Sequence, residues 1–202
     1  MTNRPKVKIC GIRSAEEINY LNRYQPDYLG FIFAKSTRQI SREDAKRLKK
    51  QLSESILSVG VFVNAPIEEI ISICDDKTID FIQLHGDEEQ ETIDLLKKEV
   101  PQKIIKAVRV KDTDDIKKAL FNHVDFLLLD SYVEKQYGGS GQTFDYHLLP
   151  EKMPDYFLAG GLNFENVENA ISICNPYCVD LNSGVETNGK KDEIKIILNF
   201  EL

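Results

Sequence analysis

Three side chains that can transfer protons each stand at the end of a short apolar run. Cys10 ends the first run, His85 follows the fourth, and Asp130 follows the sixth. A thiol, an imidazole and a carboxylate can serve general acid–base catalysis when their surroundings tune them to the working pH. Each also has a structural interpretation: a packing residue for Cys10, a turn residue for His85, and a helix cap for Asp130. Catalysis requires that the three runs end close together in space.

Segments that contain glycine in the last third of the chain are suited to binding phosphate. Gly160 and Gly161 follow the seventh apolar run, and Ser183 and Gly184 come shortly after the eighth. Residues 138–141 read Gly-Gly-Ser-Gly. Glycines let backbone amides approach phosphate oxygens closely, and the N-terminus of a following helix adds positive potential. We therefore expect these segments to bind a phosphate group, with plain tight turns as the alternative, above all for 138–141.

The apolar runs have the length of strands and recur eight times along the chain. They span residues 7–10, 28–33, 56–63, 79–84, 104–110, 124–129, 156–159 and 177–181. The runs are continuous rather than alternating, which is typical of parallel strands that are buried on both faces. The sequence therefore predicts eight parallel strands.

Amphipathic segments with helix-start signals separate these strands. Ser14 and Glu17 have the spacing of a capping box, and Ser41 precedes a segment with an apolar face formed by Ala45, Leu48 and Leu52. Further helix starts are expected at Pro66, Asp87, Asp112 and Asn163, with Ile116, Ala119 and Leu120 facing inward after Asp112. The segment after Thr143 gives the weakest helix signal. A last helix is expected from a solvated start at Lys190 and Lys191, with an apolar face formed by Ile194, Ile197 and Leu198.

Strict alternation of strands and helices predicts right-handed parallel crossovers. Eight such units in 202 residues fit an α/β fold, a (β/α)₈ TIM barrel that forms a single catalytic domain over residues 1–202. A doubly wound open sheet is the alternative, because periodicity does not reveal closure. In a closed barrel the active site lies at the C-terminal ends of the strands, where Cys10, His85, Asp130 and the glycine segments would meet.

Charge and composition exclude several kinds of partner. A formal net charge of −7 disfavours nucleic acid and anionic membranes, because both select basic surfaces. The first residues contain no apolar stretch of signal-peptide or membrane-spanning length, so we expect a cytoplasmic location. The four cysteines lack metal-binding spacing, which predicts no metal site. We expect Cys174 and Cys178 to be buried as small apolar residues.

Several stretches of the chain, in this order, resemble the phosphoribosylanthranilate isomerase family almost from end to end. They read VKICGI, YLGFIF followed by STR, VGVFVN, FIQLHGDE, KAVRV, LLLDS, YGGSGQTFDY, LAGGL, and VDLNSGVE followed by GKKD. Single stretches are generic, but their order at the ends of the expected strands is specific. Two positions depart from the family pattern: Thr37 stands where proline is commoner, and Asn182 where serine is commoner.

The resemblance implies an Amadori rearrangement of N-(5′-phosphoribosyl)anthranilate to its 1-deoxyribulose isomer in tryptophan biosynthesis, with no metal or organic cofactor. It implies that Asp130 is the general acid that opens the furanose ring, and that Cys10 is the general base that removes the C2′ proton. The acid must hold a proton near neutral pH. The base must be a thiolate, so Cys10 needs a lowered pKa.

The resemblance also assigns residues to the two ends of the substrate. Arg38 would meet the anionic anthranilate half, and His85 would line the same pocket. Gly160 and Gly161, together with Ser183 and Gly184, would hold the phosphate. The implied partner is this small molecule alone, and the chain is expected to be a monomer or a homodimer.

Two other functions fit the same barrel. A histidine-pathway isomerase catalyses the same kind of rearrangement, but its pattern places a second aspartate where Cys10 stands, and its two halves resemble each other. This sequence shows no such half-repeat. A non-catalytic barrel that senses a sugar phosphate would keep the glycine loops without needing Cys10. The presence of both Cys10 and Asp130 favours the isomerase.

Overall fold

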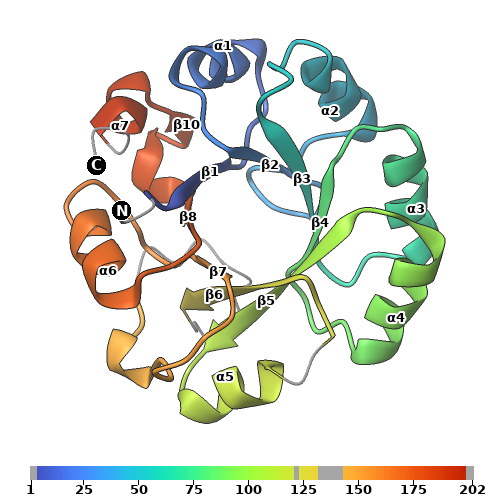
Figure 1. Cartoon of the computed structure of the whole chain (residues 1–202). Helices are drawn as coiled ribbons and strands as arrows, with labels where there is room; N and C mark the ends of the chain where they lie inside the picture. The colour runs from blue at the N-terminus through green and yellow to red at the C-terminus, as the bar shows by residue number, and fades with distance from the viewer. Residues whose placement is uncertain (1–3, 121–122, 132–142, 199–202) are drawn as a thin grey trace.

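A computed structural model of the chain describes residues 4–120, 123–131 and 143–198, and shows a closed barrel of eight parallel strands (Figure 1). The strands are β1 Lys6–Cys10, β2 Tyr28–Ile32, β3 Leu57–Phe62, β4 Phe81–Leu84, β5 Lys103–Val110, β6 Phe126–Ser131, β7 Tyr156–Leu158 and β8 Cys178–Leu181. Each strand pairs with the next, and β8 pairs with β1. The predicted (β/α)₈ barrel is therefore confirmed, and the open sheet is excluded.

Helices surround the barrel and cover its outer face (Figure 1). They are α1 Ala15–Tyr24, α2 Arg42–Lys49, α3 Ile67–Asp75, α4 Gln90–Glu99, α5 Thr113–Ala119, α6 Val167–Cys174 and α7 Glu193–Leu198. In the described residues between β6 and β7, the helical structure is the 3₁₀ turn η1, Tyr146–Leu148, in the segment with the weakest predicted helix signal. A 3₁₀ turn η2, Ser183–Val185, and an antiparallel ribbon of β9, Glu186–Thr187, and β10, Lys190–Lys191, follow β8.

Local capping signals explain three of the predicted helix starts. The Ser14 side chain accepts the amide of Glu17, and the Glu17 carboxylate accepts the amide of Ser14 in return. Ser41 accepts the amide three residues further on, and Asp112 is part of a second capping box. These bonds satisfy amides that the first turn of a helix leaves without partners. Pro66 lies at the N-cap of α3, one position before its predicted place in the first turn.

Two predicted helix starts are wrong because their side chains bond elsewhere. Asp87 does not cap α4, which begins three residues later, and its carboxylate pairs with Arg109 on β5. The side chain of Asn163 accepts the amide of Glu165 within a turn, and α6 begins only after Asn166. In both cases the capping residue type is present, but a turn intervenes before the helix.

The predicted start and face of the last helix are also wrong. Lys190 and Lys191 form β10, and Lys191 is buried rather than solvated, with 6% of its surface exposed. The helix docks through Ile196, which is fully buried, whereas Ile194 is 68% exposed. Leu198 is exposed as well, and so is Leu120 just after α5, another residue expected to face inward.

The barrel interior changes character along its axis. An apolar cluster fills more than one level of the interior, and its buried members are Tyr28, Val59, Ile105, Ala107, Leu128, Phe157, Ala159 and Cys178. Interior positions recur every second residue along a strand. The next interior positions after Leu128 and Cys178 are therefore Asp130 and Asp180, which are both buried. Polar groups thus gather at the C-terminal level of the interior, above an apolar plug.

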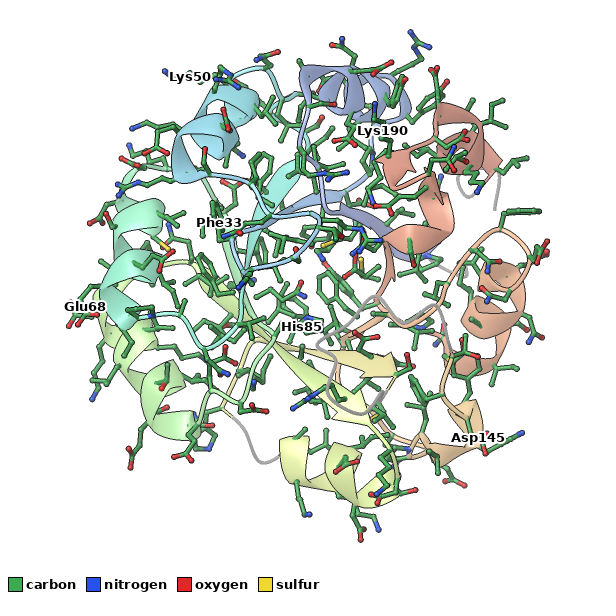
Figure 2. The ribbon with its side chains drawn as sticks, turned by 180° about the vertical axis from the view of Figure 1, so that it is seen from behind. Phe33, Lys50, Glu68, His85, Asp145 and Lys190 are labelled. Atoms are coloured by element: carbon green, nitrogen blue, oxygen red, sulfur yellow. The ribbon has the colours of Figure 1, made fainter. Side chains whose placement is uncertain are left out.

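The placement of labelled side chains agrees with this layering. From the side opposite to Figure 1, His85 lies near the centre of the ring, whereas Lys50, Glu68 and Asp145 lie at its periphery (Figure 2). All four cysteines are free and buried, including Cys174 and Cys178 as predicted. Among the described residues, none of the helices has the length and apolar character needed to span a membrane.

Candidate active site

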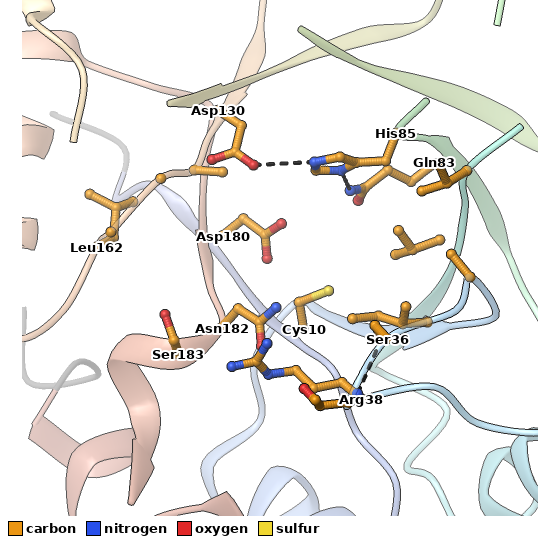
Figure 3. Close-up of a pocket in the computed structure, with 18 of the residues that line it drawn as sticks. Cys10, Ser36, Arg38, Gln83, His85, Asp130, Leu162, Asp180, Asn182 and Ser183 are labelled. Atoms are coloured by element: carbon orange, nitrogen blue, oxygen red, sulfur yellow. Dashed lines mark hydrogen bonds and ion pairs between the residues drawn. The ribbon is translucent and has the colours of Figure 1, made fainter. Parts of the chain in front are cut away.

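A cavity of about 460 Å³ lies at the C-terminal ends of the strands (Figure 3). Of the predicted site residues, it is lined by Cys10, Arg38, His85, Asp130, Gly160, Gly161 and Ser183. Gly184 does not line it. Several polar lining residues were not predicted as site residues, among them Gln83, Asp180 and Asn182. Gln83 lies on β4 two residues before His85, and Asp180 lies on β8 two residues before Asn182, so strand alternation is the signal that could have found them.

Asp130 takes part in a hydrogen-bonded chain that crosses from β6 to β4. Its Oδ2 lies 3.2 Å from Nε2 of His85, and Nδ1 of His85 lies 2.8 Å from Nε2 of Gln83. The His85 ring therefore links Gln83 on β4 to Asp130 on β6 through its two nitrogens. Asp130 Oδ1 also accepts the amide of Ser131 at 2.8 Å.

Cys10 lies at the end of β1, with 4% of its surface exposed. Its Cα partner on β2 is Gly30, where a Cβ atom would come within 2.6 Å of the Cys10 sulfur. That contact is shorter than van der Waals packing allows, so the glycine makes room for the thiol. The role of Gly30 was missed, because strand register is not visible in the sequence.

The expected lowered pKa of Cys10 is wrong for the free protein. Burial is the largest influence and raises the pKa of the thiol, because a thiolate loses its hydration inside the barrel. The cations Lys8 and Lys191 act in the opposite direction, and the carboxylate of Asp180 adds to the rise. The balance leaves the pKa above its ordinary value.

A buried ion pair lies inside the barrel beside Cys10. The ammonium of Lys8 on β1 lies 2.7 Å from Oδ2 of Asp180 on β8. The Lys8 side chain is fully buried and that of Asp180 is 6% exposed. Asp180 lies between Asp130 and Cys10 in the cavity (Figure 3). Its other oxygen, Oδ1, is buried and has no hydrogen-bond partner among the described residues.

Arg38, in the loop after β2, is held by a carboxylate from the other end of the chain. Its Nε and Nη2 donate to the two carboxylate oxygens of Glu186 at 2.8 and 2.7 Å. Lys191 donates to the same carboxylate at 2.7 Å and to the backbone and side-chain oxygens of Asn182 at 2.9 and 3.0 Å. Burial opposes ionisation of Glu186, but Arg38 and Lys191 more than offset it and lower its pKa to about 2.

The glycines of the predicted phosphate site play different structural parts. Gly160 and Gly161 have φ angles of +88° and +63°, which other residues adopt only with strain. A Cβ at Gly160 would lie 2.8 Å from the backbone nitrogen of Ser131. A Cβ at Gly184 would lie 1.9 Å from the backbone oxygen of Leu162, so Gly184 lets the loops after β7 and β8 pack together. The predicted phosphate segment 138–141 lies outside the described residues.

Two other polar residues at strand ends do not line this cavity. Asn64 has a φ of 49° and accepts the amide of Asp87, so it shapes the loops after β3 and β4. Arg109 pairs with Asp87 in a separate groove beside α5. Within the described ranges, no group of three or more His, Cys, Asp or Glu side chains could hold a metal ion.

The closed barrel, with a polar cavity where the strands end, defines the class of the protein as a (β/α)₈ barrel with an acid–base pocket at the face where such enzymes carry their active sites. A family model described as N-(5′-phosphoribosyl)anthranilate (PRA) isomerase matches residues 7–201. The chain belongs to this family of isomerases.

Individual relatives agree with that membership over nearly the whole chain. An N-(5′-phosphoribosyl)anthranilate isomerase of Endomicrobium trichonymphae is 50% identical over 193 residues, which cover 96% of this chain and 95% of the relative. The crystal structure of phosphoribosyl anthranilate isomerase from Thermotoga maritima is 36% identical, with a TM-score of 0.88 and 96% of each chain covered. A structure of such an isomerase in complex with reduced 1-(o-carboxyphenylamino)-1-deoxyribulose 5-phosphate is 35% identical, with a TM-score of 0.86, and covers 98% of this chain and 97% of its own.

Proposed function

We propose that this chain, acting as one catalytic domain, rearranges N-(5′-phosphoribosyl)anthranilate to 1-(2-carboxyphenylamino)-1-deoxyribulose 5-phosphate in tryptophan biosynthesis. The observation that carries the proposal is the meeting of Cys10 and Asp130 in one cavity of a barrel from this isomerase family. Family membership favours this enzyme over a sugar-phosphate sensor. The aspartate of the histidine-pathway pattern is absent, since Cys10 occupies its position.

Asp130 acts as the general acid in the first step. It gives a proton to the ring oxygen of the ribose as the bond from C1′ to that oxygen breaks, and the anthranilate nitrogen forms a Schiff base with C1′. Nε2 of His85 lies 3.2 Å from Oδ2 of Asp130, so His85 orients the carboxyl group.

Cys10 acts as the general base in the second step. The thiolate removes the proton from C2′, and the electron pair moves toward the nitrogen to give an enolamine, which tautomerises to the ketone. Burial raises the pKa of Cys10, so the thiolate is the minor form near neutral pH, and kcat/KM should rise as the pH increases.

The ends of the substrate are held away from the reacting carbons. Arg38 meets the carboxylate of the anthranilate ring, with its guanidinium already oriented by Glu186. The backbone at Gly160 and Gly161 and the hydroxyl of Ser183 meet the phosphate, with Gly184 supporting that site by loop packing. Proton transfers by side chains suffice for this chemistry, so we expect activity to survive treatment with a chelator. The cytoplasmic location and the monomeric or homodimeric state remain predictions.

The direct test is the loss of anthranilate-type fluorescence when the purified protein is added to freshly made phosphoribosylanthranilate. Cys10→Ser nearly preserves the shape of the side chain but replaces the thiol by a much weaker acid, so kcat should fall by about 10²–10⁴-fold. The matched control is Cys74→Ser, which changes a buried cysteine of α3 outside the cavity and should keep turnover. A folded Cys10→Ser protein with normal turnover would return Cys10 to a packing role.

A further inference from the structure

A buried lysine on β1 has no part in the steps described above. Lys8 and Cys10 are two residues apart on this strand, so alternation directs both side chains into the barrel. The register pairs Lys8 directly with Asp180 across the β1–β8 junction, and the ammonium lies 2.7 Å from the Asp180 carboxylate. A cation therefore lies inside the barrel, one interior level before the proposed base.

Stability alone does not account for this lysine. The Lys8 side chain is fully buried, and moving an ammonium out of water is costly. Apolar side chains of similar volume often replace a buried ion pair with no loss of stability. The neighbouring interior level is an apolar cluster that includes Cys178, so apolar residues are compatible with this part of the barrel. The charge of Lys8 therefore calls for another explanation.

The groups that face the Cys10 thiol carry both signs of charge. Burial has the largest influence on the pKa of Cys10 and raises it; Lys8 on β1 and Lys191 on β10 lower it, and Asp180 on β8 raises it. Arg38, in the loop after β2, interacts with the same thiol. Of the two lysines, Lys8 has the larger influence on the pKa of Cys10.

We propose that Lys8 is a positioning residue for the base: its ammonium stabilises the Cys10 thiolate within the closed pocket, and Asp180 limits how much of that charge the thiol receives. The role rests on the proposed function of Cys10. The Asp180 carboxylate and the Cys10 thiolate compete for the same ammonium. Removing Lys8 must therefore raise the pH at which Cys10 ionises, and removing the charge of Asp180 must lower it.

The test measures the ionisation of Cys10 without relying on catalysis. The full chain is treated with iodoacetamide over a range of pH, and modification of the Cys10 peptide is followed by mass spectrometry. Cys10 lines the cavity, so a small alkylating agent can reach it. Lys8→Met should move the midpoint of alkylation upward by roughly 1 to 3 pH units, the shift typical of one nearby opposite charge. Asp180→Asn should move it downward.

A second pair of variants covers the case in which Lys8→Met does not fold because it leaves the Asp180 carboxylate buried and unpaired. Comparing Asp180→Asn with Lys8→Met/Asp180→Asn isolates the effect of Lys8 without an unpaired anion. The double variant should have the higher midpoint of these two. At neutral pH its kcat should be lower than that of Asp180→Asn, with a smaller change in KM, and kcat should recover as the pH is raised. A purely structural role of Lys8 would not produce this recovery with pH.

The outcomes separate this inference from the proposed function. If the alkylation midpoint of Cys10 is the same with and without Lys8, while the separate Cys10→Ser variant is inactive, the role of Lys8 alone is overturned. A fully active Cys10→Ser chain would refute Cys10 as the base, and with it the catalytic purpose of Lys8. If Lys8→Met and Asp180→Asn shift the alkylation midpoint in opposite directions, and kcat changes with the ionisation of the Cys10 thiol, the inference is supported.

Discussion

The two proposed proton-transfer groups line one cavity but have opposite surroundings. Cys10 is faced by charged side chains, among them Lys8 and Asp180, whereas Asp130 bonds to the ring of His85 and to a backbone amide. A buried thiol needs nearby positive charge to ionise, and an acid that must carry a proton is better placed away from cations. The contrast shows how one barrel mouth can hold a base and an acid side by side.

The two regions share one packing device. A Cβ at Gly30 would lie 2.6 Å from the sulfur of Cys10, and a Cβ at Gly160 would lie 3.1 Å from Oδ1 of Asp130. Each reacting group thus lies against a glycine of a neighbouring loop or strand. The difference between the regions is therefore one of charge rather than of space, and the following experiments separate these two factors.

The largest effect is expected at the proposed acid, from Asp130→Asn. Asparagine keeps the shape and can still accept a hydrogen bond from His85, but it has no acidic proton to give. We expect kcat to fall by about 10²–10⁴-fold, with a smaller change in KM. Steady-state kinetics would check this, with Asp125→Asn as the control, because Asp125 lies just before the opposite end of the same strand and accepts the amide of Ile104. Turnover close to normal in Asp130→Asn would remove it from the mechanism.

An intermediate effect is expected when the space beside the thiol is removed by Gly30→Ala. The new methyl group would displace the sulfur, and a misplacement of the order of 1 Å can lower a rate by about 10²-fold. Overpacking should also lower the free energy of unfolding by about 1–3 kcal/mol.

Gly60→Ala is the matched control for Gly30→Ala. Its Cβ would meet Ile79 Cδ1 at 2.7 Å and an atom of Phe62 at 2.9 Å, away from the residues that line the cavity. It should lose comparable stability by urea unfolding but keep kcat. If kcat falls equally in the two variants, Gly30 is not needed to position the thiol of Cys10.

The smallest effect on turnover is expected from Glu186→Gln, which removes one anion from the charged side. The pKa of Glu186 falls from an ordinary 4.5 to about 2 in the folded protein. Its ionised carboxylate therefore stabilises the fold at pH values above about 4.5. This stabilisation is lost as the pH falls toward the pKa of the folded protein, so the loss occurs between about pH 4.5 and about pH 2. Urea unfolding of Glu186→Gln should depend less on pH in this window than unfolding of the unchanged chain. Parallel pH dependences would show that Arg38 and Lys191 do not stabilise the ionised carboxylate.

Much of the fold and part of the site follow from local sequence signals. The eight strands lie within or overlap the predicted apolar runs, because a strand buried on both faces needs a continuous apolar segment. The caps at Ser14, Ser41 and Asp112 act within three residues of themselves, so they too are visible in the sequence. Polar residues at strand ends were expected to converge, and the barrel places Cys10 and Asp130 in the same cavity.

The remaining features depend on contacts between distant parts of the chain. Asp87 and Asn163 have the residue types of helix caps, yet a turn and a partner on another element decide what they bind. Lys191 lies in a charged segment that was expected to be solvated, but the β9–β10 ribbon buries it against Glu186. In each case the residue type allows several environments, and only packing selects one of them.

The sequence by itself determined the order of strands and helices, the end of the barrel where the polar cavity lies, and the identity of the thiol and the carboxylate that line this cavity. Only the tertiary structure decided their electrostatics. Lys8 and Asp180 are 172 residues apart, and Arg38 and Glu186 are 148 apart, so neither pair has a local signal. Closure of β8 against β1 sets the register that places Lys8 beside Asp180, and burial in that closed interior then strengthens every charge around Cys10.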